Sequence, residues 1–282
     1  MTAGQGHSVP SPRVRSNLQL RVLSGAVLAV LAVGTTLAGG FWFRFFCALI
    51  GVLVFYEWAL MSRAICGRRV RAIGWLALAI VVVALVSESP LLPQAIAVAA
   101  ALLVAAALVE RGPWTLSGGV YALIAAVPLA LLRGHDFDGL AAVLILYALV
   151  WGTDSFAYFV GRTLGGPKLA PSISPGKTWS GAVGGVVCGA AAALLMAWLC
   201  GVIIDLRLVA VLLVGSVISE IGDLFESWVK RRRGVKDSSR LIPGHGGVMD
   251  RVDGLIVAAF WMLLVGGLIS GFDAPARWLL SL

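Results

Sequence analysis

The sequence has few charged residues for its length. Only 13% of its 282 residues are Asp, Glu, Lys or Arg, whereas a soluble domain of this size carries about a quarter. Hydrophobic residues make up 60% of the chain. This composition excludes an ordinary soluble domain. It predicts an all-α polytopic membrane protein, because helices satisfy their own backbone hydrogen bonds in lipid.

Cysteine is scarce as well. The four cysteines show no paired spacing, and three of them lie in or beside apolar runs; they are Cys47, Cys66, Cys188 and Cys200. They are therefore interpreted as small apolar residues, neither disulfides nor zinc ligands. Acidic residues are outnumbered, 14 against 22 basic ones, for a formal charge of +8. This excess indicates a basic membrane face and an anionic lipid or nucleotide partner, with no nucleic acid partner.

Nine apolar runs approach the roughly 20 residues that a membrane span requires. They are residues 22–40, 41–61, 72–87, 90–109, 117–132, 139–161, 179–204, 206–229 and 252–271. The runs at 72–87 and 117–132 are the shortest. The first run also resembles a secretory signal peptide, because small residues end it at 38–40, but a second apolar run follows at once. About nine transmembrane helices are therefore expected.

The basic residues predict the orientation of these spans. With a cytosolic N-terminus, all but four of the 22 Lys and Arg residues fall on the cytosolic side. The four exceptions are Arg44, Arg133, Arg207 and Arg277. This distribution obeys the positive-inside rule. It predicts an N-terminus in the cytosol and a C-terminus on the other side.

The chain divides into three regions by polarity. Residues 1–20 are polar and predict a disordered cytosolic tail, whereas residues 21–135 predict a scaffold of apolar helices. Within that scaffold, Glu57 is expected to be a snorkelling or paired carboxylate. Ionisable residues gather within residues 136–282, so this part is the expected catalytic region.

Two polar clusters open the catalytic region. In the first, a helical period places Tyr147, Trp151, Asp154, Tyr158 and Arg162 on one stripe. An intramembrane aspartate favours a functional site, although an aromatic packing stripe with an Asp–Arg pair is the alternative.

The second cluster surrounds a Pro-Gly turn before the seventh apolar run. It consists of Ser172, Ser174, Lys177, Thr178 and Ser180. Hydroxyls, backbone N–H groups and a lysine at a helix start suit a phosphate. The spacing is not that of a Walker loop, and a capped turn at the membrane surface is the alternative.

The third cluster joins the last two long apolar runs. Ser216, Glu220, Asp223, Ser227 and Lys230 share one face of a helix, and Asp250 and Asp253 share the first turn of the next. Carboxylates that converge from two helices offer hard oxygen ligands for Mg²⁺. The seven basic residues of this stretch could hold phosphate oxygens. A juxtamembrane basic loop would explain the basic residues, but not the acids.

A longer motif resembles a known family. From Ser227 to Asp253 the chain reads SWVKR, four further residues, then KDSSRLIPGHGGVMDRVD. This pattern resembles the signature of the phosphatidate cytidylyltransferases, also called CDP-diacylglycerol synthases. The DSFAYFVGR and SISPGKTW stretches resemble that family too, so the resemblance covers about residues 151–254. One departure is Gly176, where many members have a second lysine.

The resemblance implies transfer of a cytidylyl group from CTP to phosphatidic acid, giving CDP-diacylglycerol and pyrophosphate, for phospholipid biosynthesis. It implies Mg²⁺, with a second cation left open, and the metal ligands Asp223 and Asp250, then Asp253 and Asp154. Lys230, Arg231 and Lys236 join Asp223 and Asp250 as expected catalytic residues. The expected substrate-binding residues are Arg162, Ser174, Lys177, Thr178, Ser227 and His245, of which His245 is expected to hydrogen-bond within its turn rather than act as a base.

The same resemblance implies a bacterial inner-membrane enzyme whose active site faces the cytosol, among membrane lipids. A homodimer is left open. Two other classes remain. A transporter would also use intramembrane carboxylates, but near the middle of the bilayer. A CTP-dependent lipid kinase would release CDP instead of pyrophosphate.

Overall fold

The computed structural model describes residues 17–61 and 67–279. Within these residues, nine helices are long and apolar enough to cross a membrane. They are α1 (Asn17–Ala38), α2 (Gly40–Met61), α3 (Arg68–Val86), α4 (Leu92–Glu110), α5 (Trp114–Arg133), α6 (Phe137–Leu164), α7 (Trp179–Leu199), α8 (Leu206–Arg232) and α9 (Met249–Ser270). The predicted membrane protein of about nine helices is confirmed.

The two shortest apolar runs become full spans because their helices extend into polar flanks. Helix α3 begins at Arg68 and has 19 residues, and α5 extends from Trp114 to Arg133 and has 20. Long basic side chains are tolerated at the ends of a span because their charged groups reach the interface. Hydropathy alone therefore underestimates the length of both helices.

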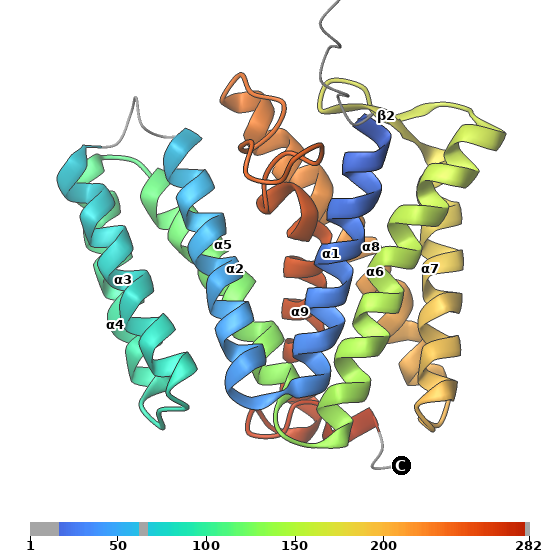
Figure 1. The fold of residues 1–282 in the computed structure, drawn as a ribbon, viewed down its shortest axis with the longest axis horizontal. Helices are drawn as coiled ribbons and strands as arrows, with labels where there is room; N and C mark the ends of the chain where they lie inside the picture. Colours follow the sequence, from blue (N-terminus) through green and yellow to red (C-terminus); the bar gives the residue numbers. More distant parts are fainter. Residues whose placement is uncertain (1–16, 62–66, 280–282) are drawn as a thin grey trace, which may run out of the picture.

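The helices form one bundle around α9 (Figure 1). Helices α2 and α5 lie on one side of α9, and α6 and α8 on the other, while the α3–α4 pair and α7 form the two edges. The α6–α7 interface is close because glycines line it. A Cβ atom on Gly185 would lie 2.8 Å from the carbonyl oxygen of Thr153. Small residues at an interface let membrane helices pack closely, and this packing contributes to their association because the hydrophobic effect does not act between helices within lipid.

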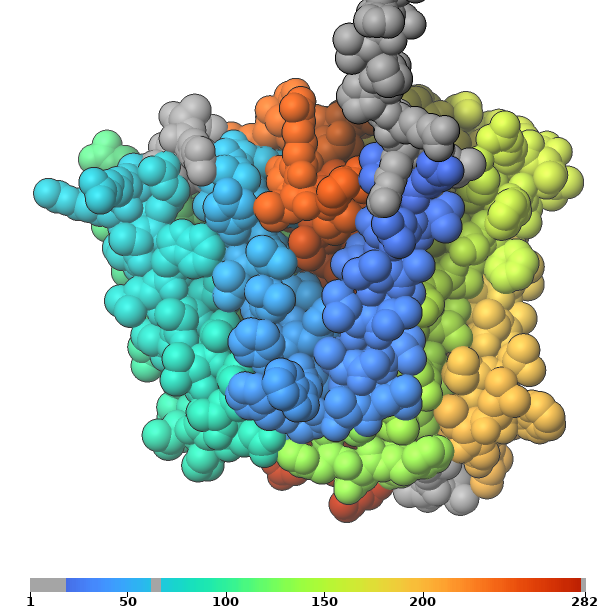
Figure 2. Space-filling view, viewed as in Figure 1, coloured from blue at the N-terminus to red at the C-terminus, as the bar shows by residue number. Residues whose placement is uncertain are grey.

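The two ends of the bundle differ in their polar content. At the end we call the loop face, α1 begins and the segment 233–248 connects α8 to α9. Figure 2 shows part of this segment seated between the ends of α1 and α2. At the opposite face, α9 ends and a short helix, η1 (Arg277–Leu279), follows. The described chain thus starts and ends on opposite faces, as nine spans require.

A β-hairpin on the loop face was not predicted. Strands β1 (Lys168–Ala170) and β2 (Ser174–Thr178) pair antiparallel, where the sequence indicated only a turn. Pro175 is tolerated because each strand of a two-stranded sheet has a free edge. The hairpin leads directly into α7, whose N-cap is Thr178. The Thr178 hydroxyl accepts a hydrogen bond from the Gly181 N–H at 3.1 Å.

The other sequence predictions on fold concern the cysteines and the tail. Cys47, Cys188 and Cys200 are free thiols, as expected, while Cys66 lies outside the described residues. The predicted tail, residues 1–20, also lies mostly outside them. Its last four residues form the first turn of α1.

Candidate active site

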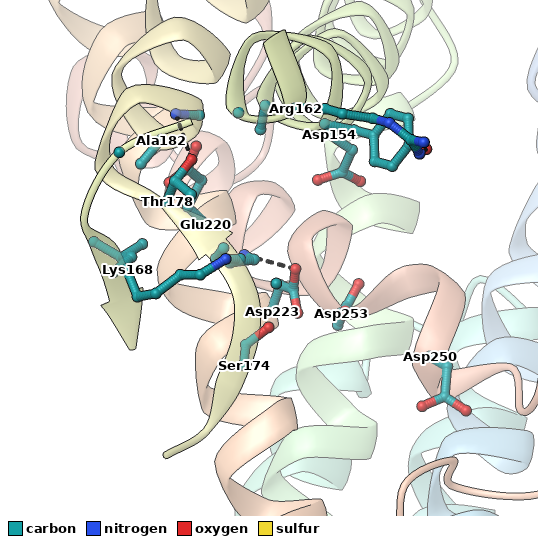
Figure 3. Close-up of a pocket in the computed structure, with 18 of the residues that line it drawn as sticks. Asp154, Arg162, Lys168, Ser174, Thr178, Ala182, Glu220, Asp223, Asp250 and Asp253 are labelled. Atoms are coloured by element: carbon teal, nitrogen blue, oxygen red, sulfur yellow. Dashed lines mark hydrogen bonds and ion pairs between the residues drawn. The ribbon is translucent and has the colours of Figure 1, made fainter. Parts of the chain in front are cut away.

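A cavity of about 790 Å³ opens at the loop face. This volume is within the range of ligand sites. Every residue that lines it lies between Asp154 and Asp253, on α6, the link from α6 to the hairpin, the hairpin itself, α7, α8, the 233–248 segment or α9. Figure 3 shows acidic side chains of α6, α8 and α9 facing basic and hydroxyl side chains of the hairpin and α6. The cavity therefore presents both signs of charge to one volume.

Three carboxylates meet where α8 crosses α9. One oxygen each of Asp223, Glu226 and Asp253 lies within 4.8 Å of the other two. Asp223 and Glu226 are neighbours on α8 because they are three residues apart. Gly222 lets α9 come close: a Cβ atom there would lie 2.9 Å from the Asp253 carbonyl oxygen. Three convergent carboxylates without a divalent cation would repel one another.

Asp223 also connects this cluster to the hairpin. The Lys177 ammonium lies 2.7 Å from its carboxylate, and the Ser227 hydroxyl donates to it at 3.3 Å. Lys177 lies in β2, one residue before the N-cap of α7, so the end of this strand fixes the direction of the Lys177 side chain. The predicted phosphate-binding lysine and the predicted metal ligand are thus adjacent, although 46 residues separate them in the sequence.

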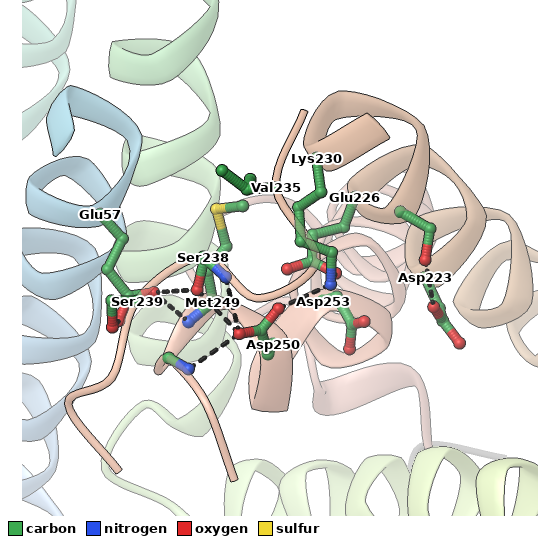
Figure 4. Close-up of polar contacts among 12 residues, drawn as sticks. Glu57, Asp223, Glu226, Lys230, Val235, Ser238, Ser239, Met249, Asp250 and Asp253 are labelled. Atoms are coloured by element: carbon green, nitrogen blue, oxygen red, sulfur yellow. Dashed lines mark hydrogen bonds and ion pairs between the residues drawn. The ribbon is translucent and has the colours of Figure 1, made fainter. Parts of the chain in front are cut away.

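Asp250 has a different environment from the other carboxylates (Figure 4). Lys230 lies between two carboxylates, 2.6 Å from Asp250 and 2.6 Å from Glu226. The backbone N–H groups of Ser238 and Gly247 also donate to Asp250, at 2.9 and 2.8 Å. The sequence grouped Asp250 with Asp223 as the leading metal ligands. Asp250 lines the same cavity as Asp223 but is surrounded by donors, whereas Asp253 and Glu226 cluster with Asp223. A metal-ligand role of Asp250 stays a prediction.

The other predicted residues divide between cavity and support. Asp154, Arg162, Ser174 and Thr178 line the cavity, and Arg162 donates to the Tyr158 hydroxyl at 2.7 Å. The stripe predicted on α6 therefore reaches the site with its last turns.

Arg231, Lys236 and His245 do not line the cavity. Arg231 donates to the carbonyl oxygens of Ile173 and Val235, at 3.2 and 3.3 Å, and so ties the hairpin turn to the end of α8. Lys236 is exposed on the 233–248 segment. These two residues were predicted to be catalytic. In the described part of the chain, Arg231 has a supporting position and Lys236 lies outside the cavity lining, so the catalytic role of both stays a prediction.

His245 contacts α1 instead of the cavity. Its Nδ1 atom is 2.7 Å from the Ser24 hydroxyl, and Arg21 donates to the Gly244 carbonyl oxygen at 2.8 Å. Partial burial lowers the pKa of His245, and the nearby charges of Arg251 and Arg21 lower it further. The imidazole thus hydrogen-bonds to α1 rather than within its own turn. Within the turn it is the backbone N–H of His245 that donates, to the Ile242 carbonyl oxygen at 3.0 Å.

Five charged residues at the site were not among the predicted site residues. Glu226 belongs to the carboxylate cluster, and four others line the cavity: Lys168, Glu220, Asp237 and Arg251. Glu226 is visible in the sequence as an i,i+4 partner of Lys230. The stripe predicted on this helix runs through Ser227 instead and so does not include Glu226.

These observations define an integral membrane protein with a charged cavity at one face of its bundle. A model of the cytidylyltransferase family matches residues 19–268, and the chain therefore belongs to this family of enzymes. The phosphatidate cytidylyltransferase of Brucella suis biovar 1 is 44% identical over 264 residues, covering 93% of this chain and 97% of the relative. That of Haemophilus influenzae is 46% identical over 130 residues, covering 44% of this chain and 45% of the relative.

Proposed function

We propose that the chain transfers the cytidylyl group of CTP to phosphatidic acid, giving CDP-diacylglycerol and pyrophosphate. One observation carries the proposal: a cavity at the loop face holds a carboxylate cluster next to the Lys177 end of a hairpin. The similarity over almost the whole length of relatives named phosphatidate cytidylyltransferase supports the choice of substrates.

The reaction of these substrates does not require a strong general base. A phosphate monoester has a second pKa of about 6, so the attacking oxygen of phosphatidic acid is already anionic. The demand is instead to neutralise the triphosphate and to align the two substrates for in-line displacement. We assign the triphosphate to the basic and hydroxyl groups that line the cavity: Arg162, Lys168, Ser174, Lys177 and Arg251.

The carboxylate cluster fits Mg²⁺ by its donors. Asp223, Glu226 and Asp253 supply hard oxygen atoms from two helices within one ion's reach. When bound there, Mg²⁺ would stabilise negative charge on the phosphate oxygens of the nucleotide. Asp154 lines the same cavity from α6, where it is the residue available for a second cation. Asp250 holds Lys230 in place next to the cluster.

We place the cavity on the cytosolic side of a bacterial inner membrane, because CTP is a cytosolic nucleotide and most of the basic residues that the structure describes lie at the loop face. Reporter fusions after Glu88, after Asp136 and at the C-terminus should therefore all report the non-cytosolic side. Glu88 and His135 lie together at the opposite face, 3.4 Å apart. A fusion after Gly234 on the loop face is the control and should report the cytosol. A cytosolic signal from the C-terminal fusion would contradict this orientation.

The direct test is an assay of the purified protein with CTP, Mg²⁺ and vesicles that contain either phosphatidic acid or diacylglycerol. The proposal expects pyrophosphate and CDP-diacylglycerol with phosphatidic acid, and no reaction with diacylglycerol. CDP release with diacylglycerol would identify a CTP-dependent lipid kinase instead. A transporter would form neither product.

Lys177→Ala is expected to raise the KM for CTP by about 10- to 100-fold. This is the loss of affinity that corresponds to the free energy of one charge-assisted hydrogen bond. The KM for phosphatidic acid should change much less, because Lys177 lies on the hairpin among the groups assigned to the triphosphate. Steady-state kinetics with each substrate varied in turn measures both constants. Arg69→Ala, in the first turn of α3, removes one basic residue far from the cavity and should change neither. A rise only in the KM for phosphatidic acid would refute the assignment.

A further inference from the structure

Glu57 connects the scaffold helices to the 233–248 segment. It lies one turn before the end of α2, and it is fully buried although it is a carboxylate. Its oxygens accept four hydrogen bonds. The donors are the hydroxyls of Ser238 and Ser239 and the backbone N–H groups of Val248 and Met249, at 2.7–2.8 Å. A buried carboxylate with this many donors is fully satisfied, so its position is fixed.

The two backbone donors belong to the start of α9. The first N–H groups of a helix have no partner within the helix, and the N-cap of α9 is Val248, which offers no capping side chain. Glu57 supplies the missing acceptors from another helix, and its negative charge also favours the N-terminal end of the α9 dipole. Glu57 therefore acts as the cap of α9.

The contact is close enough to exclude larger residues. A Cβ atom on Gly247 would lie 2.5 and 2.6 Å from the two Glu57 oxygens. Glycine at this position lets the segment approach α2, and the Gly247 N–H then donates to Asp250. Ser238 bridges the two carboxylates, because its hydroxyl is 2.8 Å from Glu57 and 3.0 Å from Asp250.

A continuous set of contacts thus runs from the scaffold to the cavity. Glu57 holds Ser238, Ser238 and Gly247 hold Asp250, and Asp250 holds Lys230 beside the carboxylate cluster (Figure 4). Glu57 itself does not line the cavity. We propose that Glu57 is a positioning residue for the reaction: by capping α9 from α2, it sets the places of Asp250 and Lys230. The inference rests on the proposed function.

Glu57→Gln tests the proposal at constant side-chain size. The amide replaces one acceptor oxygen with an NH2 group, which faces two donors. We expect kcat to fall by about 10- to 100-fold, as for residues that orient functional groups without contacting substrate. The KM for CTP should rise by less than kcat falls, because Arg251 is the one group on α9 among the five that we assign to the triphosphate. Hydrogen exchange at the Val248 and Met249 amides should become faster, while exchange in α7 stays unchanged.

Glu110→Gln is the matched control. Glu110, at the end of α4, accepts from the Thr115 N–H near the start of α5 at 3.1 Å, so it also serves a helix start, but one remote from the cavity. Its kcat should equal that of the wild type. Wild-type kcat and exchange in Glu57→Gln would overturn the proposal. So would a fall in thermal stability without a change of kcat in the folded enzyme, because that result describes a purely structural residue.

Ser239→Ala covers the case in which Glu57→Gln does not reach the membrane. The Ser239 hydroxyl donates to Glu57 at 2.7 Å and does not contact Asp250. The variant should lower kcat by a few-fold and speed exchange at Val248, and unchanged values would overturn the proposal. In the double variant, Ser239→Ala should add little to Glu57→Gln, since the two act on one contact.

A wild-type enzyme inactive with CTP and phosphatidic acid would instead refute the proposed function, whereas the exchange result would still report on the cap.

Discussion

Asp223→Asn is expected to lower Mg²⁺-dependent pyrophosphate release by about 10²- to 10³-fold, the scale for loss of a group that acts on transition-state charge. Asp223 is the carboxylate that contacts both halves of the site. It lies in the cluster with Glu226 and Asp253, and its own oxygen is 2.7 Å from Lys177. Asparagine keeps the shape of the side chain but removes the charge that either a divalent cation or Lys177 requires.

Binding of Mn²⁺, followed by its electron paramagnetic resonance signal, gives a second readout for Asp223→Asn. The variant should bind Mn²⁺ more weakly at matched expression and folding. Asp138→Asn, in the first turn of α6 at the opposite face, makes the same chemical change and should behave as the wild type. The double variant Asp223→Asn/Asp253→Asn should be little worse than Asp223→Asn, because ligands of one ion act as a unit. Near-normal turnover in Asp223→Asn would remove the cluster from the mechanism.

Lys230→Met is expected to reduce turnover by at least about 10²-fold and to destabilise the folded enzyme by about 3 kcal/mol or more. The Lys230 side chain is 11% exposed and lies between two nearly inaccessible carboxylates, Glu226 and Asp250. Its removal leaves two like charges in a region with little water to screen them. Thermal unfolding in detergent, together with the pyrophosphate assay, measures both effects.

Two further variants separate this effect from bulk charge. Arg232→Gln also removes one positive charge from the last turn of α8, but Arg232 packs on the exposed ring of Trp228, 4.4 Å from its centre. This variant should keep most of the activity. Adding Asp250→Asn to Lys230→Met should recover part of the lost stability, because it removes one of the two repelling charges, without restoring turnover. Equal losses in Lys230→Met and Arg232→Gln would argue against a specific role for Lys230.

The helices and the positions of the polar clusters could be predicted from the sequence, because both depend on local pattern. Hydropathy located all nine helices, and a period of 3.6 residues placed Asp223 and Lys230 on the face of α8 that reaches the cavity. The helical period could not predict which of Asp250 and Asp253 lies next to Asp223. Which of the two meets Asp223 depends on how α8 and α9 cross, and on the donors that the 233–248 segment brings to Asp250.

Contacts between distant segments were beyond this kind of reasoning. The hairpin pairs Lys168 with Thr178 across two prolines that indicate a turn when read alone. Glu57 was expected to be a snorkelling or paired carboxylate. It is fully buried and paired, but its partners are 181–192 residues away, and nothing near Glu57 in the sequence identifies them. His245 was expected to hydrogen-bond within its turn, whereas the partner of its side chain, Ser24, belongs to the first helix.

Because α1 and α2 bind the 233–248 segment, the half of the chain that lines the cavity depends on the half that does not. A fragment that begins at Asp136 would contain every side chain of the cavity, yet α9 would lack the acceptors of Glu57, and the turn at His245 would lack Ser24. Such a fragment could not be transplanted as a self-sufficient module. Two separately expressed halves, 1–135 and 136–282, would have to reassemble in one membrane before the missing acceptors were restored. The first half of the chain, although it lines no part of the cavity, is therefore required for the second half to keep its structure.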